Sequence, residues 1–167
     1  PDCRTPRVVC GTLRHPALIA AVSGETDHIT LSEAVLPDHA TLSVAEGPFP
    51  MIVPEAGAGA EGVLAEGMTA ADLARLDYYE KAFDYTLTEV TLADGRAARA
   101  YMPTPGRWTT QGPWSLQAWA RDWGELSVTA AREVMSYRGQ KPPEEIAGMF
   151  PMIRARAWSR LNAVASR

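Results

Sequence analysis

The alternation of apolar and polar residues predicts a strand-rich first part of the chain. An apolar run over residues 7–10 predicts the first strand, and residues 16–22 predict a helix with proline in its first turn, where proline costs no helical hydrogen bond. Between residues 29 and 63 the chain is interrupted by several prolines and glycines, so we expect only short strands there. The best candidates are residues 40–44, 51–53 and 62–65.

A second helix is predicted over residues 70–79. Thr69 is a favourable N-cap, Asp72 follows it three residues later, and an apolar stripe that includes Leu76 has helical spacing. Glu80 falls at the carboxyl end of this helix, on the same stripe. The pattern therefore places one carboxylate where the helix meets the next segment.

The rest of the chain predicts a β-hairpin followed by helices. Residues 85–92 alternate strongly between two faces, and Asp94-Gly95 is a favourable hairpin turn into residues 97–102. Beyond residue 105 the apolar period becomes helical. The predicted helices cover residues 116–123, 128–137, 143–150 and 153–164.

These elements predict one α+β domain over residues 1–167. The chain has 167 residues, which suits a single domain that buries roughly 70% of its unfolded surface. We expect a β-rich core over residues 1–104, built as a small mixed, barrel-like sheet with surrounding helices. Residues 105–167 are expected to form a helical extension packed on that core.

Composition narrows the class of partner. The formal net charge is −4, which argues against a general nucleic-acid binder, and no apolar run reaches the roughly 18 residues of a membrane span. Cys3 and Cys10 suggest neither a disulfide framework nor a zinc site, so we expect a soluble, cytoplasmic protein without a metal. Because the chain begins at Pro1, we expect that end to be processed, trimmed or incomplete, and we read no targeting signal from it.

Two short motifs carry the candidate chemistry. The first, Cys10-Gly11-Thr12-Leu13-Arg14, follows the first strand, and a strand that breaks at glycine and enters a helix exposes amides able to hold an anion or a carbonyl oxygen. An ordinary turn explains Gly11 equally well.

The second motif, Leu76-Asp77-Tyr78-Tyr79-Glu80, sets a carboxylate beside aromatic rings. If these rings bury the carboxyl group, its pKa is raised. The alternative is a solvated Glu80 paired with Lys81, which would lower that pKa.

Together these motifs resemble the gamma-glutamyl cyclotransferase-like superfamily. The corresponding features there are a strand with a Tyr-Gly-Thr/Ser loop, a Leu-Asp-x-Tyr-Glu-Gly helix end, a nearby Tyr matched by Tyr85, and a hairpin. More narrowly, the order of short motifs is similar to bacterial tellurite-resistance-type members, which can be fused to a Nudix ADP-ribose pyrophosphatase. These motifs begin at Leu36, Pro48, Phe83, Pro113 and Phe150. Cys10 in place of Tyr and Lys81 in place of Gly depart from the family pattern.

The resemblance implies an acyl transfer without a cofactor. The α-amine of a small γ-glutamyl amine or amide would attack its own γ-carbonyl and form 5-oxoproline, with Glu80 as base and then acid. The implied substrate-binding residues are Cys10, Gly11, Thr12, Leu13, Arg14 and Tyr85. The alternative is a catalytically idle binding or regulatory module of the tellurite-resistance type, acting with a Nudix partner domain. In either case the sequence is compatible with a homodimer and does not decide the oligomeric state.

Three other patterns favour ordinary structural roles. A segment from Gly124 to Gly139 resembles a Nudix box but fails in spacing and in its Mg²⁺ ligands, so an amphipathic helix explains it better. Trp119 and Trp123 are expected on one helix face, in the core or a subunit interface more readily than in a ligand-stacking lid. Basic residues of the last helix are expected on a solvated face; they are Arg154, Arg156 and Arg160.

Overall fold

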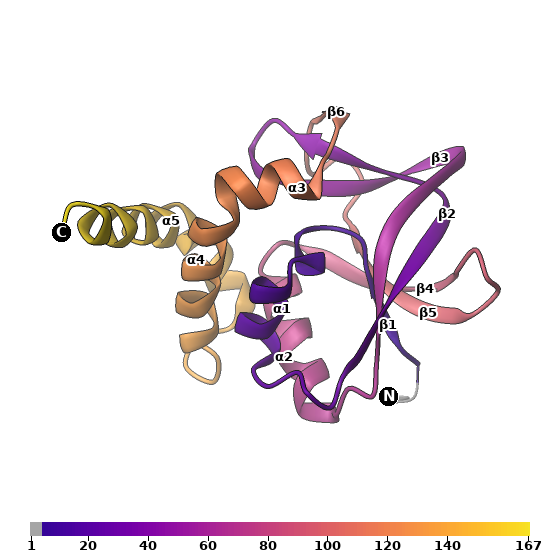
Figure 1. Ribbon diagram of the computed structural model, residues 1–167, viewed down its shortest axis with the longest axis horizontal. Helices are drawn as coiled ribbons and strands as arrows, with labels where there is room; N and C mark the ends of the chain where they lie inside the picture. Colours follow the sequence, from indigo (N-terminus) through magenta and orange to yellow (C-terminus); the bar gives the residue numbers. More distant parts are fainter. Residues whose placement is uncertain (1–4) are drawn as a thin grey trace.

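The computed structural model describes residues 5–167 and contains a six-stranded mixed sheet with the order β4-β5-β1-β3-β2-β6 (Figure 1). The strands are β1 (Arg7–Val9), β2 (Thr30–Val44), β3 (Gly47–Glu66), β4 (Tyr85–Thr91), β5 (Ala97–Pro103) and β6 (Thr110–Pro113). Strand β1 is parallel to β5, and the other neighbouring pairs are antiparallel. The predicted α+β class with a mixed sheet is confirmed.

The sheet curls on itself around an apolar interior. The amide of Ala93, in the β4–β5 turn, donates to the carbonyl of Val35 in β2 over 2.9 Å, which joins one edge of the sheet to a strand near the other edge. A cluster made only of residues from strands and their adjoining turns fills the inside of the curl, with Leu36, Leu64 and Ala100 at its most buried positions. The sheet is therefore barrel-like, as predicted.

The prediction of short strands between residues 29 and 63 was wrong. Strands β2 and β3 run through the prolines and pair along most of their length, because the register shifts where the prolines occur. Pro37 pairs with Gly59, whereas His39 pairs with Pro54, and the intervening Asp38 adopts a φ of 57°. At such a bulge a proline nitrogen needs no ladder hydrogen bond, so the strand bends without ending.

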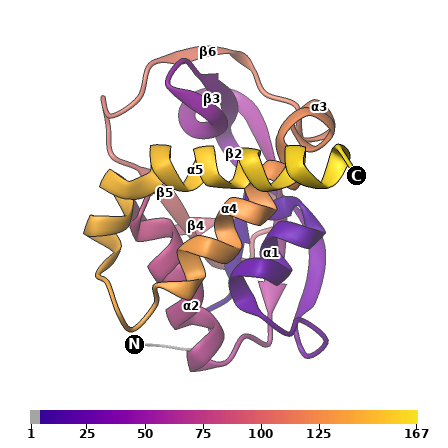
Figure 2. The same cartoon turned by 90° about the vertical axis from the view of Figure 1, so that its left-hand side faces the viewer.

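The helices form two layers on one side of the sheet. They are the 3₁₀ turn η1 (Thr12–Arg14), α1 (Pro16–Ser23), α2 (Ala70–Lys81), α3 (Leu116–Trp119), the π-helical turn η2 (Ala120–Gly124), α4 (Glu125–Ser136) and α5 (Pro143–Ala165). Figure 1 shows α1 and α2 next to the sheet and α4 beyond them, and Figure 2 shows α5 crossing in front of α4. The main apolar cluster lies between the sheet and these helices.

Helix α2 begins at the predicted cap. The Thr69 hydroxyl accepts from the Asp72 amide over 3.2 Å, and the Asp72 carboxylate accepts from the Thr69 amide over 2.7 Å, which completes a capping box. Leu76 is fully buried, and the last turn of the helix buries Tyr79 and Glu80 as well. Packing of one face therefore fixes where the carboxyl end of α2 lies.

The helical part is more continuous than predicted. Helices α3 and α4 join through the π turn, which rotates the stripe so that Trp119 is 4% exposed and Trp123 is 39% exposed; the prediction that they share one face was wrong. Helix α5 runs through Pro151, where we expected two helices. Ile146 and Ile153, on either side of that proline, are both fully buried against the same core, which holds the helix together across the lost hydrogen bond.

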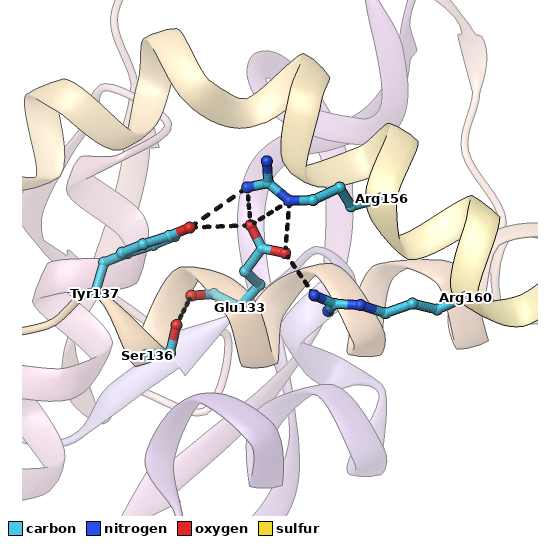
Figure 3. Close-up of polar contacts among 5 residues, drawn as sticks. All are labelled: Glu133, Ser136, Tyr137, Arg156 and Arg160. Atoms are coloured by element: carbon cyan, nitrogen blue, oxygen red, sulfur yellow. Dashed lines mark hydrogen bonds and ion pairs between the residues drawn. The ribbon is translucent and has the colours of Figure 1, made fainter.

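A polar cluster joins α5 to α4 (Figure 3). The Glu133 carboxylate of α4 accepts from Arg156 of α5 and lies 3.3 Å from the Arg160 guanidinium, and the Tyr137 hydroxyl donates to it over 3.3 Å. The side chain of Glu133 is only 8% exposed. The segment that resembles a Nudix box therefore uses its glutamate to hold two helices together. The predicted solvated face is found for Arg160, whose side chain is 57% exposed, whereas Arg156 is partly covered by its contact with Glu133.

Candidate active site

One deep pocket opens between the end of β1, the start of β3, the end of α2 and the outer helices. Its empty volume is about 910 Å³, which includes the open space at its mouth. Residues 8–13 and 48–52 line one side, and Tyr79, Glu80 and Phe83 line another. Segments that are far apart in the sequence therefore meet around one cavity.

The segment after β1 contributes backbone amides to this pocket. Gly11 is the N-cap of η1, and within residues 5–167 the amides of Thr12 and Leu13 donate no hydrogen bond. A Cβ placed on Gly11 would lie 3.3 Å from the Cγ of Pro50, so a larger residue would crowd the facing wall. The start of this short helical turn therefore offers unpaired donors to a ligand.

Glu80 is the acidic side chain of the pocket. It is 7% exposed, and among the described residues its carboxyl group forms neither an ion pair nor a hydrogen bond. Burial, with a smaller contribution from the Asp77 carboxylate, raises the pKa of Glu80 to about 8. Lys81 points to the exposed side of the helix, so the alternative of a solvated Glu80–Lys81 pair was wrong.

Two tyrosines flank Glu80. The Tyr85 hydroxyl, at the start of β4, donates to the Pro50 carbonyl over 3.1 Å and ties two walls of the pocket together. The Tyr101 hydroxyl of β5 donates to Asp77, one turn before Glu80. Burial is the main cause that raises the pKa of each tyrosine, so both hydroxyls stay protonated at neutral pH. The sequence analysis named Tyr85 and missed Tyr101, which carried only a strand signal.

The other predicted substrate-binding residues divide into two groups. Gly11, Thr12 and Leu13 line the pocket together with Glu80 and Tyr85. Cys10 also contributes to the lining, but the residue is 2% exposed and packs in the strand cluster, where burial raises the pKa of its thiol to about 11. Arg14 is not part of the lining and pairs with Glu61 over 3.2 Å. Cys3 lies outside the described residues.

Sequence reasoning missed the outer wall of the pocket. Trp119 donates its indole N–H to the Pro48 carbonyl over 2.7 Å and borders the cavity, so one tryptophan serves both core packing and pocket lining. Phe150 and Arg154 of α5 complete this wall. The spacing of these residues on a helix gave no sign of which cavity they would face.

Two further observations concern metals and membranes. Within residues 5–167 no group of three or more His, Cys, Asp or Glu side chains is arranged to hold a metal ion. None of the helices in that range is long and apolar enough to cross a bilayer.

Comparison with known families identifies the sequence over most of the sheet. The model of the gamma-glutamyl cyclotransferase, AIG2-like family matches residues 8–121, which include β1, the Gly11 segment, α2 and Glu80. The chain belongs to this family. Helix α5, with Phe150 and Arg154, lies beyond the matched residues. No curated protein matches the chain.

Solved structures agree with this assignment at the level of the fold. A structure titled gamma-glutamyl cyclotransferase is 15% identical, with a TM-score of 0.54, and the match covers 89% of this chain and 98% of that one. The solution structure of At5g39720.1 from Arabidopsis thaliana is 21% identical, with a TM-score of 0.54 and coverages of 85% and 97%. Protein PH0828 from Pyrococcus horikoshii is 17% identical, with a TM-score of 0.51 and coverages of 68% and 91%.

Proposed function

We propose that this protein is a gamma-glutamyl cyclotransferase-type enzyme that releases 5-oxoproline from a small γ-glutamyl amine or amide, with Glu80 as the general acid and base. The observation that carries the proposal is the buried, unpaired carboxyl group of Glu80, with a pKa raised to about 8, in one pocket with the free amides of Thr12 and Leu13. Family membership alone supports the fold and the reaction class, so the proposal rests on this geometry.

The reaction needs one proton carrier and one anion-stabilising group. The Glu80 carboxylate would accept a proton from the α-ammonium group, and the neutral amine would attack the γ-carbonyl carbon. The new C–N bond closes the five-membered ring, and Glu80 gives its proton to the leaving nitrogen as the bond to that nitrogen breaks. Glu80 then takes the second proton from the ring nitrogen and releases it to solvent, which restores the carboxylate. The amides of Thr12 and Leu13 would stabilise the negative charge that develops on the carbonyl oxygen.

The direct test is release of 5-oxoproline from a panel of γ-glutamyl compounds. We expect turnover by the wild type and a loss of about 10²–10⁴-fold in Glu80→Gln, because the amide keeps the shape of the side chain but can neither accept nor return a proton. Glu89→Gln is the control, since it makes the same change in an exposed glutamate of β4 outside the pocket. We expect it to retain activity. Full activity in Glu80→Gln would contradict the assigned role.

The rate should also follow the ionisation of Glu80. Because the reaction begins with the carboxylate form, kcat/KM of the wild type should rise with pH, reach half of its maximum near pH 8 and level off above it. A profile that is already flat at pH 6 would mean that another group accepts the proton.

An idle module of the tellurite-resistance type is the second candidate. The observation that favours it is Cys10, whose buried thiol leaves the pocket without the hydroxyl that the family pattern supplies. Such a module would bind a γ-glutamyl compound without releasing 5-oxoproline and would act on a Nudix partner domain. In either form of the proposal we expect a cytoplasmic protein, because two cysteines seven positions apart do not suggest a disulfide framework.

A further inference from the structure

Arg154 is the basic side chain of the pocket, and the proposed chemistry does not use it. Glu80 and Arg154 are the acidic and basic members among the lining residues, and within residues 5–167 Arg154 forms no ion pair, whereas Arg156 and Arg160 of the same helix both pair with Glu133. The guanidinium group lies 5.3 Å from the centre of the Phe150 ring, which holds it against the pocket wall.

Arg154 and Glu80 occupy different parts of the pocket. The guanidinium group reaches the start of β3, where a Cβ placed on Gly47 would lie 3.6 Å from its Nη2 atom. Arg154 also borders the adjoining surface cavity next to Trp108, so it stands at the entrance. Tyr79 lines the same cavity, and the charges of both Glu80 and Arg154 act on the pKa of its hydroxyl. A ligand with its reacting atoms at Glu80 would therefore place its remote end at Arg154.

We propose that Arg154 determines specificity by binding a carboxylate on the leaving group, so that the preferred substrates are γ-glutamyl amino acids or peptides and not γ-glutamyl alkylamines. This inference rests on the proposed cyclotransferase function and names its substrate class. A planar guanidinium can give two parallel hydrogen bonds to a carboxylate, which makes Arg a better receptor for this group than a single positive charge.

The charge balance of the pocket agrees with an anionic ligand. With Glu80 mostly protonated at neutral pH, Arg154 gives the lining a net positive charge. Burial lowers the pKa of Arg154 from its ordinary value, and no acidic residue of the described chain offsets that cost. A ligand carboxylate would supply the missing partner. Because this contact is remote from the reacting bond, it should act mainly on KM.

The test uses two ligands that differ by one carboxylate, γ-glutamyl-alanine and γ-glutamyl-ethylamine. We expect the wild type to prefer the first by about 10–100-fold in kcat/KM, the usual contribution of charge-assisted hydrogen bonds. Arg154→Gln should lose this preference through a higher KM for γ-glutamyl-alanine and should leave the ethylamine compound nearly unchanged. Arg154→Lys should fall between the two. Arg160→Gln removes a charge from the same helix outside the pocket, and it should keep the preference.

Binding separates this inference from the proposed function. Calorimetry with the same two compounds is performed on Glu80→Gln and on Glu80→Gln/Arg154→Gln, after thermal melts show that both variants are folded. A preference for γ-glutamyl-alanine that disappears in the double variant supports the role of Arg154, even if the wild type releases no 5-oxoproline and the proposed function fails. Turnover of both compounds with equal KM, or no carboxylate preference in binding, overturns the inference and leaves the cyclotransferase proposal intact.

Discussion

Glu80 and Glu133 are two helical glutamates whose pKa values are shifted in opposite directions: Glu80 is deeply buried, whereas Glu133 lies near the surface beneath two partly exposed arginines. Glu80 has no partner among the described residues, and its neighbour is a like charge, so burial raises its pKa to about 8. Glu133 receives hydrogen bonds from Arg156 and Tyr137 and lies beside Arg160, and these contacts lower its pKa despite burial (Figure 3). Burial and hydrogen-bond partners together decide whether the pKa of a carboxyl group is raised or lowered.

The difference assigns the two residues to different tasks. A carboxyl group whose protonated and ionised forms are both accessible near neutral pH can carry protons, which suits a catalytic pocket. A carboxylate held ionised by two guanidinium groups cannot release its charge and instead fixes α5 on α4. The helix that carries Arg154 is therefore positioned by the second glutamate, while the first is left free to react.

The largest effect should be seen in the pH dependence of stability. The folded-state pKa of Glu80 is raised from 4.5 to about 8. The favourable contribution of its protonated form to the free energy of unfolding is therefore fully present below pH 4.5 and is lost as pH rises through 8. At about 1.4 kcal/mol per pKa unit, this amounts to roughly 4–5 kcal/mol, an upper limit if water enters the pocket. Denaturant unfolding at pH 5 and pH 8.5 should show the stability difference between Glu80→Gln and wild type moving by this amount in favour of the variant.

Glu133→Gln should behave in the opposite way. Because its folded-state pKa is lowered, the carboxylate stabilises the protein above about pH 4.5, and this contribution is lost as pH falls through the folded-state pKa. We expect the variant to be less stable by about 1–2 kcal/mol at pH 7, a value discounted because both arginines are partly exposed. The penalty should shrink towards pH 3. A penalty that is equal at both pH values would mean that packing, not charge, holds the helices together.

The smallest expected effect is the difference in stability loss between substitutions of Arg156 and Arg160. Arg156 is 37% exposed and makes several hydrogen bonds to Glu133, whereas Arg160 is 57% exposed and makes one contact at 3.3 Å. Arg160→Gln should cost less stability than Arg156→Gln, because it removes one contact of an exposed side chain. Thermal melts at low and high salt measure both. Equal losses for the two variants would contradict the unequal geometry.

The sequence predicted those elements that depend on local signals. The Thr69–Asp72 cap, the Asp94-Gly95 hairpin and the strand before Gly11 are each specified by a few neighbouring residues, and the structure contains all three. The tolerance of β2 and β3 for proline was not predictable, because it depends on a register shift between two strands. The same holds for Pro151, whose helix continues because both halves pack on one core.

The site was predictable only on the side that the family motifs cover. Glu80, Gly11 and Tyr85 belong to motifs that resemble the family, and the structure brings them to one pocket, although their roles stay predictions. Arg154 was expected on a solvated face, because charge on a helix gives no sign of which cavity that helix will face. Arg14 was expected in the pocket because it adjoins the loop, yet Glu61 of a neighbouring strand binds it. Tertiary contacts decided both cases.

The pocket draws on nearly the whole length of the chain, from Val8 to Arg154. Closing such long loops costs conformational entropy before any contact rewards it, so the site belongs to the completed fold and not to an early intermediate. A compound that binds there therefore binds only the fully folded chain, and its binding stabilises the whole chain against unfolding. At a concentration of 100 times its Kd, such a ligand raises the unfolding free energy by about 2.7 kcal/mol, irrespective of whether it reacts.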